Sequence, residues 1–277
     1  MSIRLLALDL DGTIFGDDLV ISARTRKAIE CTQHQGVLVT IATGRMFVSA
    51  RAIAADLNID APLICYQGAM VRHSHSGEML YHKTVPAGLA HEIISKTQEM
   101  GLHLNLYLND AIYAARISEE ALFYSRINMG LAINEVGNLN TWLDAQGGAE
   151  PTKLVIITDP DQTDQVLRLF TEQYGTKLQV TKSHPRFTEF TSIECSKGRA
   201  LAFLAEHTGV DRSEVMAIGD GHNDLDMIAW AGHGVAMASA PQEVLDAART
   251  VCAALLDDGT AETIERYVLD DAKNRGN

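Results

Sequence analysis

One short segment near the start of the chain constrains the fold more than any other. Residues 5–10 read LLALDL, so every residue except Asp9 is apolar. A strand without alternation of apolar and polar residues is typical of a parallel sheet that helices cover on both faces. A buried carboxylate costs several kcal/mol unless a partner stabilises it. The segment therefore predicts a central strand that ends at a site able to hold Asp9 and, two residues later, Asp11.

Composition and charge exclude several classes of function. At 277 residues the chain exceeds a typical domain of ~100–200 residues, so we expect one large or two smaller domains. The net charge of −13 disfavours nucleic acid or an anionic membrane as the partner, but not a small anionic substrate. No apolar run approaches the ~20 residues of a membrane span, and the N-terminus lacks a signal-peptide pattern. We therefore predict a cytoplasmic protein whose four scattered cysteines are buried free thiols.

Strands and helices alternate in the first third of the chain. Strands are predicted around residues 3–8, 37–44 and 62–71, with helices over 21–36 and 46–58 between them. The same alternation resumes in the last third of the chain. It predicts an α/β core with a doubly wound parallel sheet.

The middle of the chain has a different rhythm. Helical segments are mixed there with pairs of strands, including two strands on either side of Asn109 and Asp110. This mixture predicts a smaller α+β domain inserted into the first. We place the core in residues 1–84 and 189–277 and the inserted domain in residues 85–188.

Four polar clusters fall where predicted strands end or predicted helices begin. They read DLDGT (residues 9–13), TGR (43–45), SKG (196–198) and GDGHND (219–224). Ligands of parallel α/β sheets bind at the carboxyl ends of the strands. We therefore expect the four clusters to meet at one site.

The clusters supply the groups that a phosphate and metal site needs. Asp9 and Asp220 offer hard oxygen ligands suited to Mg2+. Thr43 offers a hydroxyl and a backbone N–H near a helix start, and Lys197 offers a positive charge for phosphate oxygens. Asp9 is the best-placed nucleophile, because carboxylates form aspartyl-phosphate intermediates and no serine–histidine pair or reactive cysteine is evident.

Each cluster alone has an ordinary structural explanation. Asp and Gly are common in strand–helix turns, a lysine at a helix start is commonly solvated, and Asp224 could simply favour a helix N-terminus. The four clusters in this order, each at a strand end or helix start, are far more specific than any one of them.

The motifs DLDGT, ATGR, SKG and GDGHNDLDM resemble those of the haloacid dehalogenase superfamily of phosphatases. The insert resembles the type-IIB cap of its Cof-like subfamily, and the resemblance extends to GVAMASA and DDGTAETIE near the end of the chain. It implies a Rossmannoid core with a mobile α/β cap. It also implies a Mg2+-dependent phosphatase acting on a small phosphorylated metabolite, such as a sugar phosphate, a nucleotide or a phosphorylated cofactor.

The resemblance implies a role for each matching residue. Asp9 matches the nucleophile, and Asp11 matches the general acid–base, whose main-chain carbonyl also binds the metal. The positions that match phosphate contacts are Leu10, Thr43, Gly44, Lys197 and Asn223, and those that match metal ligands are Asp9, Asp11, Asp220 and Asp224.

Two motifs depart from the family's pattern, and one further residue has no assigned role. Gln67 stands where the family often has the asparagine of Asn-Gly-Ala, and residues 236–240 read AMASA in place of AMGNA. Both changes bear on substrate contacts more than on the chemistry. Glu189 stands where Cof-like proteins usually carry a glutamate before the third motif, and the sequence predicts no role for it.

Two other functions fit the same motifs. A phosphotransferase or mutase would pass the phosphoryl group to a second hydroxyl in place of water. A non-catalytic phosphate-binding protein would keep the fold without turnover, although the presence of all the expected reactive residues disfavours it. The sequence predicts neither an oligomeric state nor one particular substrate.

Overall fold

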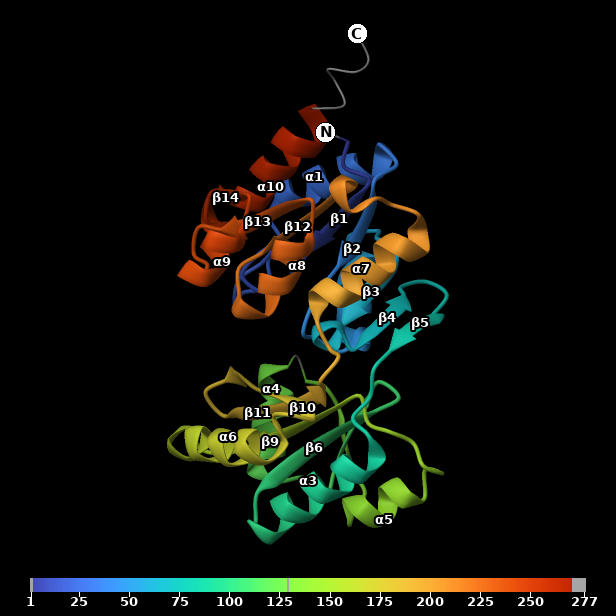
Figure 1. Ribbon diagram of the computed structural model, residues 1–277, viewed down its shortest axis with the longest axis vertical. Coiled ribbons are helices and arrows are strands. Elements are labelled where there is room, and N and C mark those ends of the chain that lie inside the picture. The colour runs from blue at the N-terminus through green and yellow to red at the C-terminus, as the bar shows by residue number, and fades with distance from the viewer. Residues whose placement is uncertain (1, 129, 271–277) are drawn as a thin grey trace. The chain divides into compact units, whose positions relative to one another are not determined.

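The computed structural model describes residues 2–128 and 130–270 (Figure 1). The chain divides into two compact units. The first unit holds the residues up to Tyr81 and those from Ser196 onward, and the second holds His82–Cys195. The first is built on a parallel sheet and the second on a largely antiparallel one, which confirms the predicted fold class of an α/β core with an α+β insert.

The observed division differs from the predicted one at both ends of the insert. The predicted boundary between residues 188 and 189 falls inside β11 (Phe187–Ser192), which belongs to the sheet of the second unit. The other boundary follows Tyr81 and not residue 84. The pairing of β11 with β9 and β10, which the sequence does not display, places residues 189–192 in the second unit.

Five parallel strands form the sheet of the first unit. They are β1 (Leu5–Leu8), β2 (Leu38–Ile41), β12 (Val215–Gly219), β13 (His233–Met237) and β14 (Thr250–Cys252). Their order is β14-β13-β12-β1-β2, so β1 has a partner on each side. Every residue of β1 is buried, as the apolar segment LLAL predicts for an interior strand.

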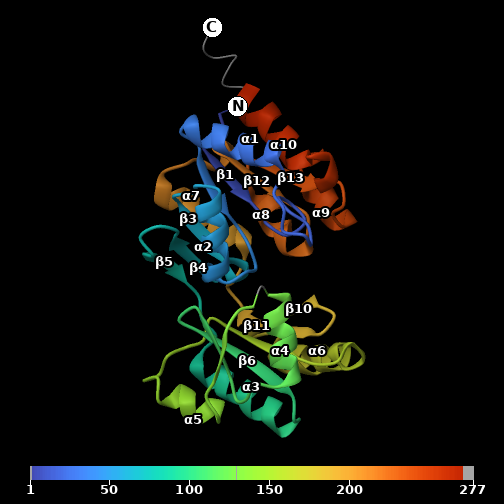
Figure 2. The same ribbon diagram turned by 180° about the vertical axis from the view of Figure 1, so that it is seen from behind.

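Helices cover both faces of this sheet. They are α1 (Ala23–His34), α2 (Phe47–Asp56), α7 (Lys197–Thr208), α8 (Leu225–Trp230), α9 (Gln242–Ala247) and α10 (Gly259–Ile264), with short turns η2 (Arg212–Glu214), η3 (His222–Asp224), η4 (Leu255–Asp257) and the π-turn η5 (Glu265–Leu269). Helices α7 and α8 cover the face seen in Figure 1, and α1 and α2 cover the face seen in Figure 2. Ser22 caps α1 as predicted, because its hydroxyl accepts a hydrogen bond from the N–H of Thr25.

The predicted third strand over residues 62–71 is wrong, because the chain reverses within it. The strands β3 (Pro62–Cys65) and β4 (Met70–His73) are antiparallel and are joined by the 3-10 turn η1 (Tyr66–Gly68). All three turn residues have a positive φ. With β5 (Met79–His82) these strands form a separate three-stranded sheet.

Six strands form the sheet of the second unit. They are β6 (His103–Leu108), β7 (Ala111–Ala114), β8 (Ile133–Glu135), β9 (Lys153–Ile157), β10 (Leu178–His184) and β11, in the order β10-β11-β9-β6-β7-β8. The helices of this unit are α3 (Ala87–Glu99), α4 (Glu119–Ile127), α5 (Leu139–Asp144) and α6 (Pro160–Tyr174). Apolar side chains of α3, α5 and α6 share one buried cluster with alternate residues of β6 and β9. As predicted, β6 and β7 flank Asn109 and Asp110.

A buried ion pair lies on the other face of this sheet. The side chains of Lys153 on β9 and Glu189 on β11 are 7% and 6% exposed, and Nζ lies 2.7 Å from Oε1. The hydroxyl of Ser183 donates to the same Oε1 at 2.5 Å. These contacts give Glu189, which had no predicted role, a structural partner within its own unit.

Two further predictions concern the state of the cysteines and the lack of a membrane-spanning segment. All four cysteines are free; Cys65 and Cys195 are buried as predicted, whereas Cys31 and Cys252 are partly exposed. Within residues 2–128 and 130–270, every helix is too short or too polar to cross a membrane.

Replacing Lys153 by methionine should destabilise the second unit strongly. The substitution leaves the Glu189 carboxylate buried without its cation, so we expect the free energy of unfolding to fall by about 3–5 kcal/mol. Chemical denaturation followed by tryptophan fluorescence would measure this loss. In a Trp230→Phe background Trp142, the other of the two tryptophans, reports on the second unit.

The matched control is Lys182→Met in the same unit. Lys182 pairs with Asp164 at 2.6 Å, but their side chains are 34% and 61% exposed, so this pair contributes at most about 1 kcal/mol. Equal losses in the two variants would contradict a special role for the buried pair.

Candidate active site

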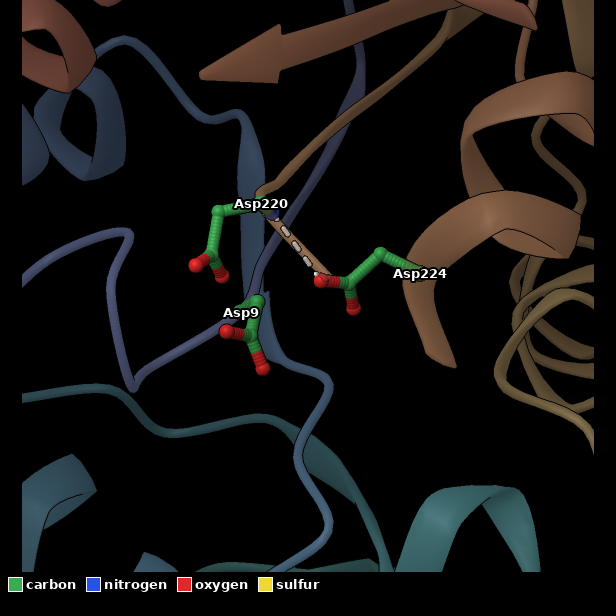
Figure 3. Close-up of side chains that lie close together, drawn as sticks. All are labelled: Asp9, Asp220 and Asp224. Atoms are coloured by element: carbon green, nitrogen blue, oxygen red, sulfur yellow. Dashed lines mark hydrogen bonds between the residues drawn. The ribbon is translucent and has the colours of Figure 1, made fainter. Parts of the chain in front are cut away.

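Three carboxylates converge at the carboxyl ends of β1 and β12 (Figure 3). Asp9 follows β1, and its N–H donates to the carbonyl of Ile218 at 3.0 Å, which extends the pairing of the two strands. Asp220 follows β12, and Asp224 ends the turn η3. One carboxylate oxygen of each lies within 4.8 Å of the others. The structure thus brings the first and fourth sequence clusters together.

Lys197 joins this cluster from the start of α7. Its Nζ lies 2.7 Å from Oδ1 of Asp9 and 2.6 Å from Oδ1 of Asp224, and its side chain is fully buried. Burial alone would lower the pKa of Lys197, but the two carboxylates raise it above its ordinary value. The lysine is therefore held as a cation, and the third sequence cluster is part of the same site.

The charges of the cluster do not cancel. Burial, followed by repulsion from Asp224, raises the pKa of Asp9 well above its ordinary value despite the attraction of Lys197. The same two causes raise the pKa of Asp220 to about 6. One ammonium faces three carboxylates, so a further cation would stabilise their ionised forms.

The donor set fits Mg2+. Carboxylate oxygens are hard ligands, and Mg2+ binds proteins through one or two of them together with water and substrate phosphate. Both N–H groups of Asp220 and Gly221 donate to Oδ2 of Asp224, at 3.0 and 2.9 Å, which fixes that carboxylate beside the other two. Figure 3 shows the three side chains close together, with the hydrogen bond between Asp220 and Asp224 as a dashed line.

One glycine allows the loop after β1 to approach the cluster. Gly12 has a φ of +81°, and a Cβ on this residue would lie 2.1 Å from Oδ2 of Asp220. Any side chain there would collide with the carboxylate. The glycine of DLDGT is therefore a packing requirement of the site.

Asp11 does not follow the strand geometry that the sequence predicts. Residues two apart lie on the same side of a strand only while the strand continues. Here β1 ends at Leu8, and the carbonyl of Leu10 accepts three N–H groups from the turn that follows. Among the described residues, the acidic cluster comprises only the other three aspartates. The carboxylate of Asp11 is instead paired with Arg45, at 2.8 Å from Nε and 2.5 Å from Nη2, and is about half exposed.

Arg45 is a site residue that the sequence reasoning named but gave no role. It is the last residue of the TGR motif. The sequence does show an arginine and an aspartate that follow neighbouring strands. Arginine favours a forked pair with a carboxylate, so this placement could have suggested the contact.

Thr43 differs from its predicted role in one respect. Its N–H donates to the carbonyl of Ile64 at 2.8 Å, so it is not the free backbone donor that we expected. Helix α2 begins at Phe47, one residue after the predicted start, so Thr43 lies near a helix start as predicted but outside its first turn. The buried hydroxyl of Thr43 accepts the N–H of Arg45 at 3.2 Å, and its own proton remains able to donate to a phosphate.

The other predicted phosphate contacts are Leu10, Asn223 and Gly44. The side chain of Leu10 is fully buried, so only its backbone could meet a phosphate. Asn223 is exposed, and its Nδ2 donates to Oε1 of Gln67 at 3.0 Å. The amide nitrogen of Gln67 would lie 2.4 Å from a Cβ on Gly44, so this side chain packs against the bare Cα.

Comparison with known proteins agrees with this geometry. The sequence profile of the haloacid dehalogenase-like hydrolases matches residues 6–264. A solved haloacid dehalogenase-like hydrolase from Bacteroides thetaiotaomicron is 29% identical, has a TM-score of 0.86, and the match covers 96% of this chain and 99% of that one.

Two curated relatives are named for their substrates. The 5-amino-6-(5-phospho-D-ribitylamino)uracil phosphatase YcsE of Bacillus subtilis strain 168 is 29% identical over 97% of this chain and 97% of its own length. The HMP-PP phosphatase of Escherichia fergusonii is 27% identical over 86% and 85%. These names and the profile confirm the predicted enzyme class, a phosphatase, and because the profile spans nearly the whole chain, the protein belongs to the haloacid dehalogenase-like hydrolase family.

Proposed function

We propose that the protein is a Mg2+-dependent phosphatase that hydrolyses a small phosphomonoester through an aspartyl-phosphate on Asp9. The observation that carries this proposal is the buried cluster in which Lys197 bridges Asp9 and Asp224 while Asp220 lies alongside. A carboxylate nucleophile, a fixed cation and a metal-ligand set within one cluster are the requirements of phosphoryl transfer to an enzyme.

The carboxylates of Asp9, Asp220 and Asp224 are the proposed metal ligands. Asp11 stays a proposed ligand only through its main-chain carbonyl, because its carboxylate is paired with Arg45. When bound, Mg2+ neutralises charge that develops on the phosphoryl oxygens. The ammonium of Lys197 adds a second, permanent positive charge from the protein itself.

In the proposed first step, a carboxylate oxygen of Asp9 attacks the phosphorus and the bond to the ester oxygen breaks. Asp11, once its carboxylate has separated from Arg45 and taken up a proton, gives that proton to the departing oxygen, so an alcohol leaves. Lys197 and the hydroxyl of Thr43 are the proposed donors to the phosphoryl oxygens, with Gly44 and Leu10 acting through their backbone and Asn223 through its amide.

In the second step, Asp11 takes a proton from a water molecule, which attacks the phosphorus. The bond between phosphorus and the Asp9 oxygen then breaks, releasing inorganic phosphate and the free carboxylate. Arg45 holds the carboxylate of Asp11 outside the acidic cluster, so the nucleophile and the acid–base occupy different environments. Two carboxylates in different environments can take different roles in one reaction.

A small phosphorylated metabolite is the proposed substrate. The relatives from Bacillus subtilis and Escherichia fergusonii are named for such compounds, a phosphoribitylamino-uracil and HMP-PP. A sugar phosphate, a nucleotide and a phosphorylated cofactor all remain within this class. The net charge of −13 makes a nucleic acid an unfavourable substrate.

Replacing Asp9 by asparagine should abolish turnover and leave the fold intact. The amide cannot form the aspartyl-phosphate, so hydrolysis of p-nitrophenyl phosphate with Mg2+ should fall at least about 10³-fold. The substitution also removes one of three mutually repelling carboxylates, so Tm in EDTA should not fall.

Asp17→Asn is the matched control, because this exposed aspartate lies in the loop after the DLDGT motif. It should keep the wild-type rate. Wild-type turnover that survives EDTA would contradict the proposed metal, and an Asp9→Asn enzyme with the wild-type rate would contradict the proposed nucleophile.

Stabilisation by Mg2+ should grow between pH 5 and pH 7.5. The pKa of Asp220, about 6 in the metal-free fold, exceeds the ordinary value of 3.8, so the folded protein binds a proton more tightly than the unfolded chain. The contribution to stability is therefore greatest below pH 4 and is lost as pH rises through 6. Metal binds the ionised carboxylate, so its apparent affinity should weaken by up to about tenfold per pH unit below pH 6.

Thermal unfolding at pH 5 and pH 7.5, each with Mg2+ and with EDTA, measures this effect. The rise in Tm caused by Mg2+ should be larger at pH 7.5 and absent in Asp220→Asn at both pH values. An equal rise at the two pH values in the wild type would show that the carboxylate of Asp220 does not compete for a proton in the metal site.

A further inference from the structure

The turn η1, between β3 and β4, contacts the loops that carry the site. The N–H groups of Tyr66 and Gln67 donate to the carbonyls of Arg45 and Thr43, at 3.0 and 3.1 Å. Across the turn, a Cβ on Gly68 would lie 2.2 Å from the carbonyl oxygen of Ser196, directly before Lys197. The turn therefore packs against the loop after β2, residues 43–45, which we call the phosphate loop, and against the start of α7.

Two non-glycine residues of this turn are held in an unfavourable backbone conformation. Tyr66 and Gln67 have φ values of 53° and 58°, in the left-handed region that glycine adopts most easily. Glycine at position 67 would remove this strain, because glycine adopts the same backbone angles without a steric clash. A strained residue that persists beside an active site is a reason to ask what its side chain does there.

The side chain of Gln67 connects two parts of the site. Its Oε1 accepts a hydrogen bond from Nδ2 of Asn223 at 3.0 Å, and its amide nitrogen packs against the Cα of Gly44. One amide thus touches the loop after β2 and the loop after β12, from a backbone that is itself bonded to Thr43. Asn223 has no other hydrogen bond recorded among the described residues, so its orientation depends on this contact.

We propose that Gln67 is a positioning residue, which holds Asn223 and the Thr43–Gly44 loop in the arrangement that binds the transferring phosphoryl group. This inference rests on the proposed function. Gln67 acts through Asn223 and the Thr43–Gly44 loop, because its side chain contacts both from the strained turn. Misplacing such groups by an ångström is enough to slow a reaction strongly.

Gln67→Gly separates positioning from folding. It removes the amide and the left-handed strain together, so Tm should rise by about 2–4 °C while kcat/KM for p-nitrophenyl phosphate falls at least about tenfold. Asn58→Gly is the matched control, because Asn58 has a φ of 52° and is exposed at the end of α2. It should keep the wild-type kcat/KM. A Gln67→Gly enzyme with the wild-type kcat/KM would overturn the proposal.

A double-mutant cycle tests whether Gln67 acts through Asn223. Methionine at position 67 keeps the length and the strain but cannot accept the hydrogen bond, so Gln67→Met should lower kcat/KM by about tenfold. In an Asn223→Ala background the same change should cost less than about threefold, because the bond is already gone. Equal losses in both backgrounds would overturn the proposal and would indicate that Gln67 contacts the phosphate directly.

Turnover by the wild-type enzyme distinguishes a failure of this proposal from a failure of the proposed function. Turnover by the wild type and its loss in Asp9→Asn establish the reaction whatever Gln67 does. If the wild type lacks turnover, the proposed function fails, and the affinity for inorganic phosphate in the presence of Mg2+, measured by calorimetry, replaces kcat/KM in the same cycle. Independent effects of Gln67→Met and Asn223→Ala on that affinity would then overturn the positioning role.

Discussion

The buried ammonium of Lys197 is the interaction on which the rest of the site depends. It lies within 2.7 Å of Asp9 and 2.6 Å of Asp224, so it allows two carboxylates to be buried side by side. Without it, burial and the repulsion from Asp224 would favour the protonated form of Asp9 still further, and a protonated aspartate is neither a nucleophile nor a metal ligand. Because the lysine is the first residue of α7, the position of that helix on the sheet also fixes the charge balance of the site.

Around this ion cluster, the backbone brings four loops to one end of a parallel sheet. Gly12 allows the loop after β1 to approach Asp220, and the strained turn at Tyr66 and Gln67 packs against Gly44 and, through Gly68, against Ser196. Arg45 then ties the loop after β2 to Asp11. The proposed nucleophile Asp9 is thus held in a buried cluster, whereas the proposed acid–base Asp11 and Asn223 are exposed and held by hydrogen bonds.

The interior strand, the insert and the convergence of Asp9, Lys197, Asp220 and Asp224 could be predicted from the sequence, because they follow from strand periodicity and from where strands end. The position of Asp11 could not, since β1 stops at Leu8 and the next turn is set by bonds to the Leu10 carbonyl. The reversal after β3 depends on left-handed backbone angles at two ordinary residues, which no propensity favours. The partner of Glu189 lies on a neighbouring strand and is visible only once β9 and β11 are paired.

The arrangement of strands in the sequence has a consequence for how the protein acquires its site during synthesis. β1 leaves the ribosome early, but its neighbour β12 and the lysine that stabilises Asp9 come much later, since Lys197 follows Asp9 by 188 positions in the sequence. The second unit is one continuous segment, so its sheet can form first, as contiguous domains generally do during translation. Until α7 and β12 emerge, Asp9 is an uncompensated carboxylate on an unfinished sheet edge, and the nascent core is exposed to chaperones and to misassociation for most of its elongation.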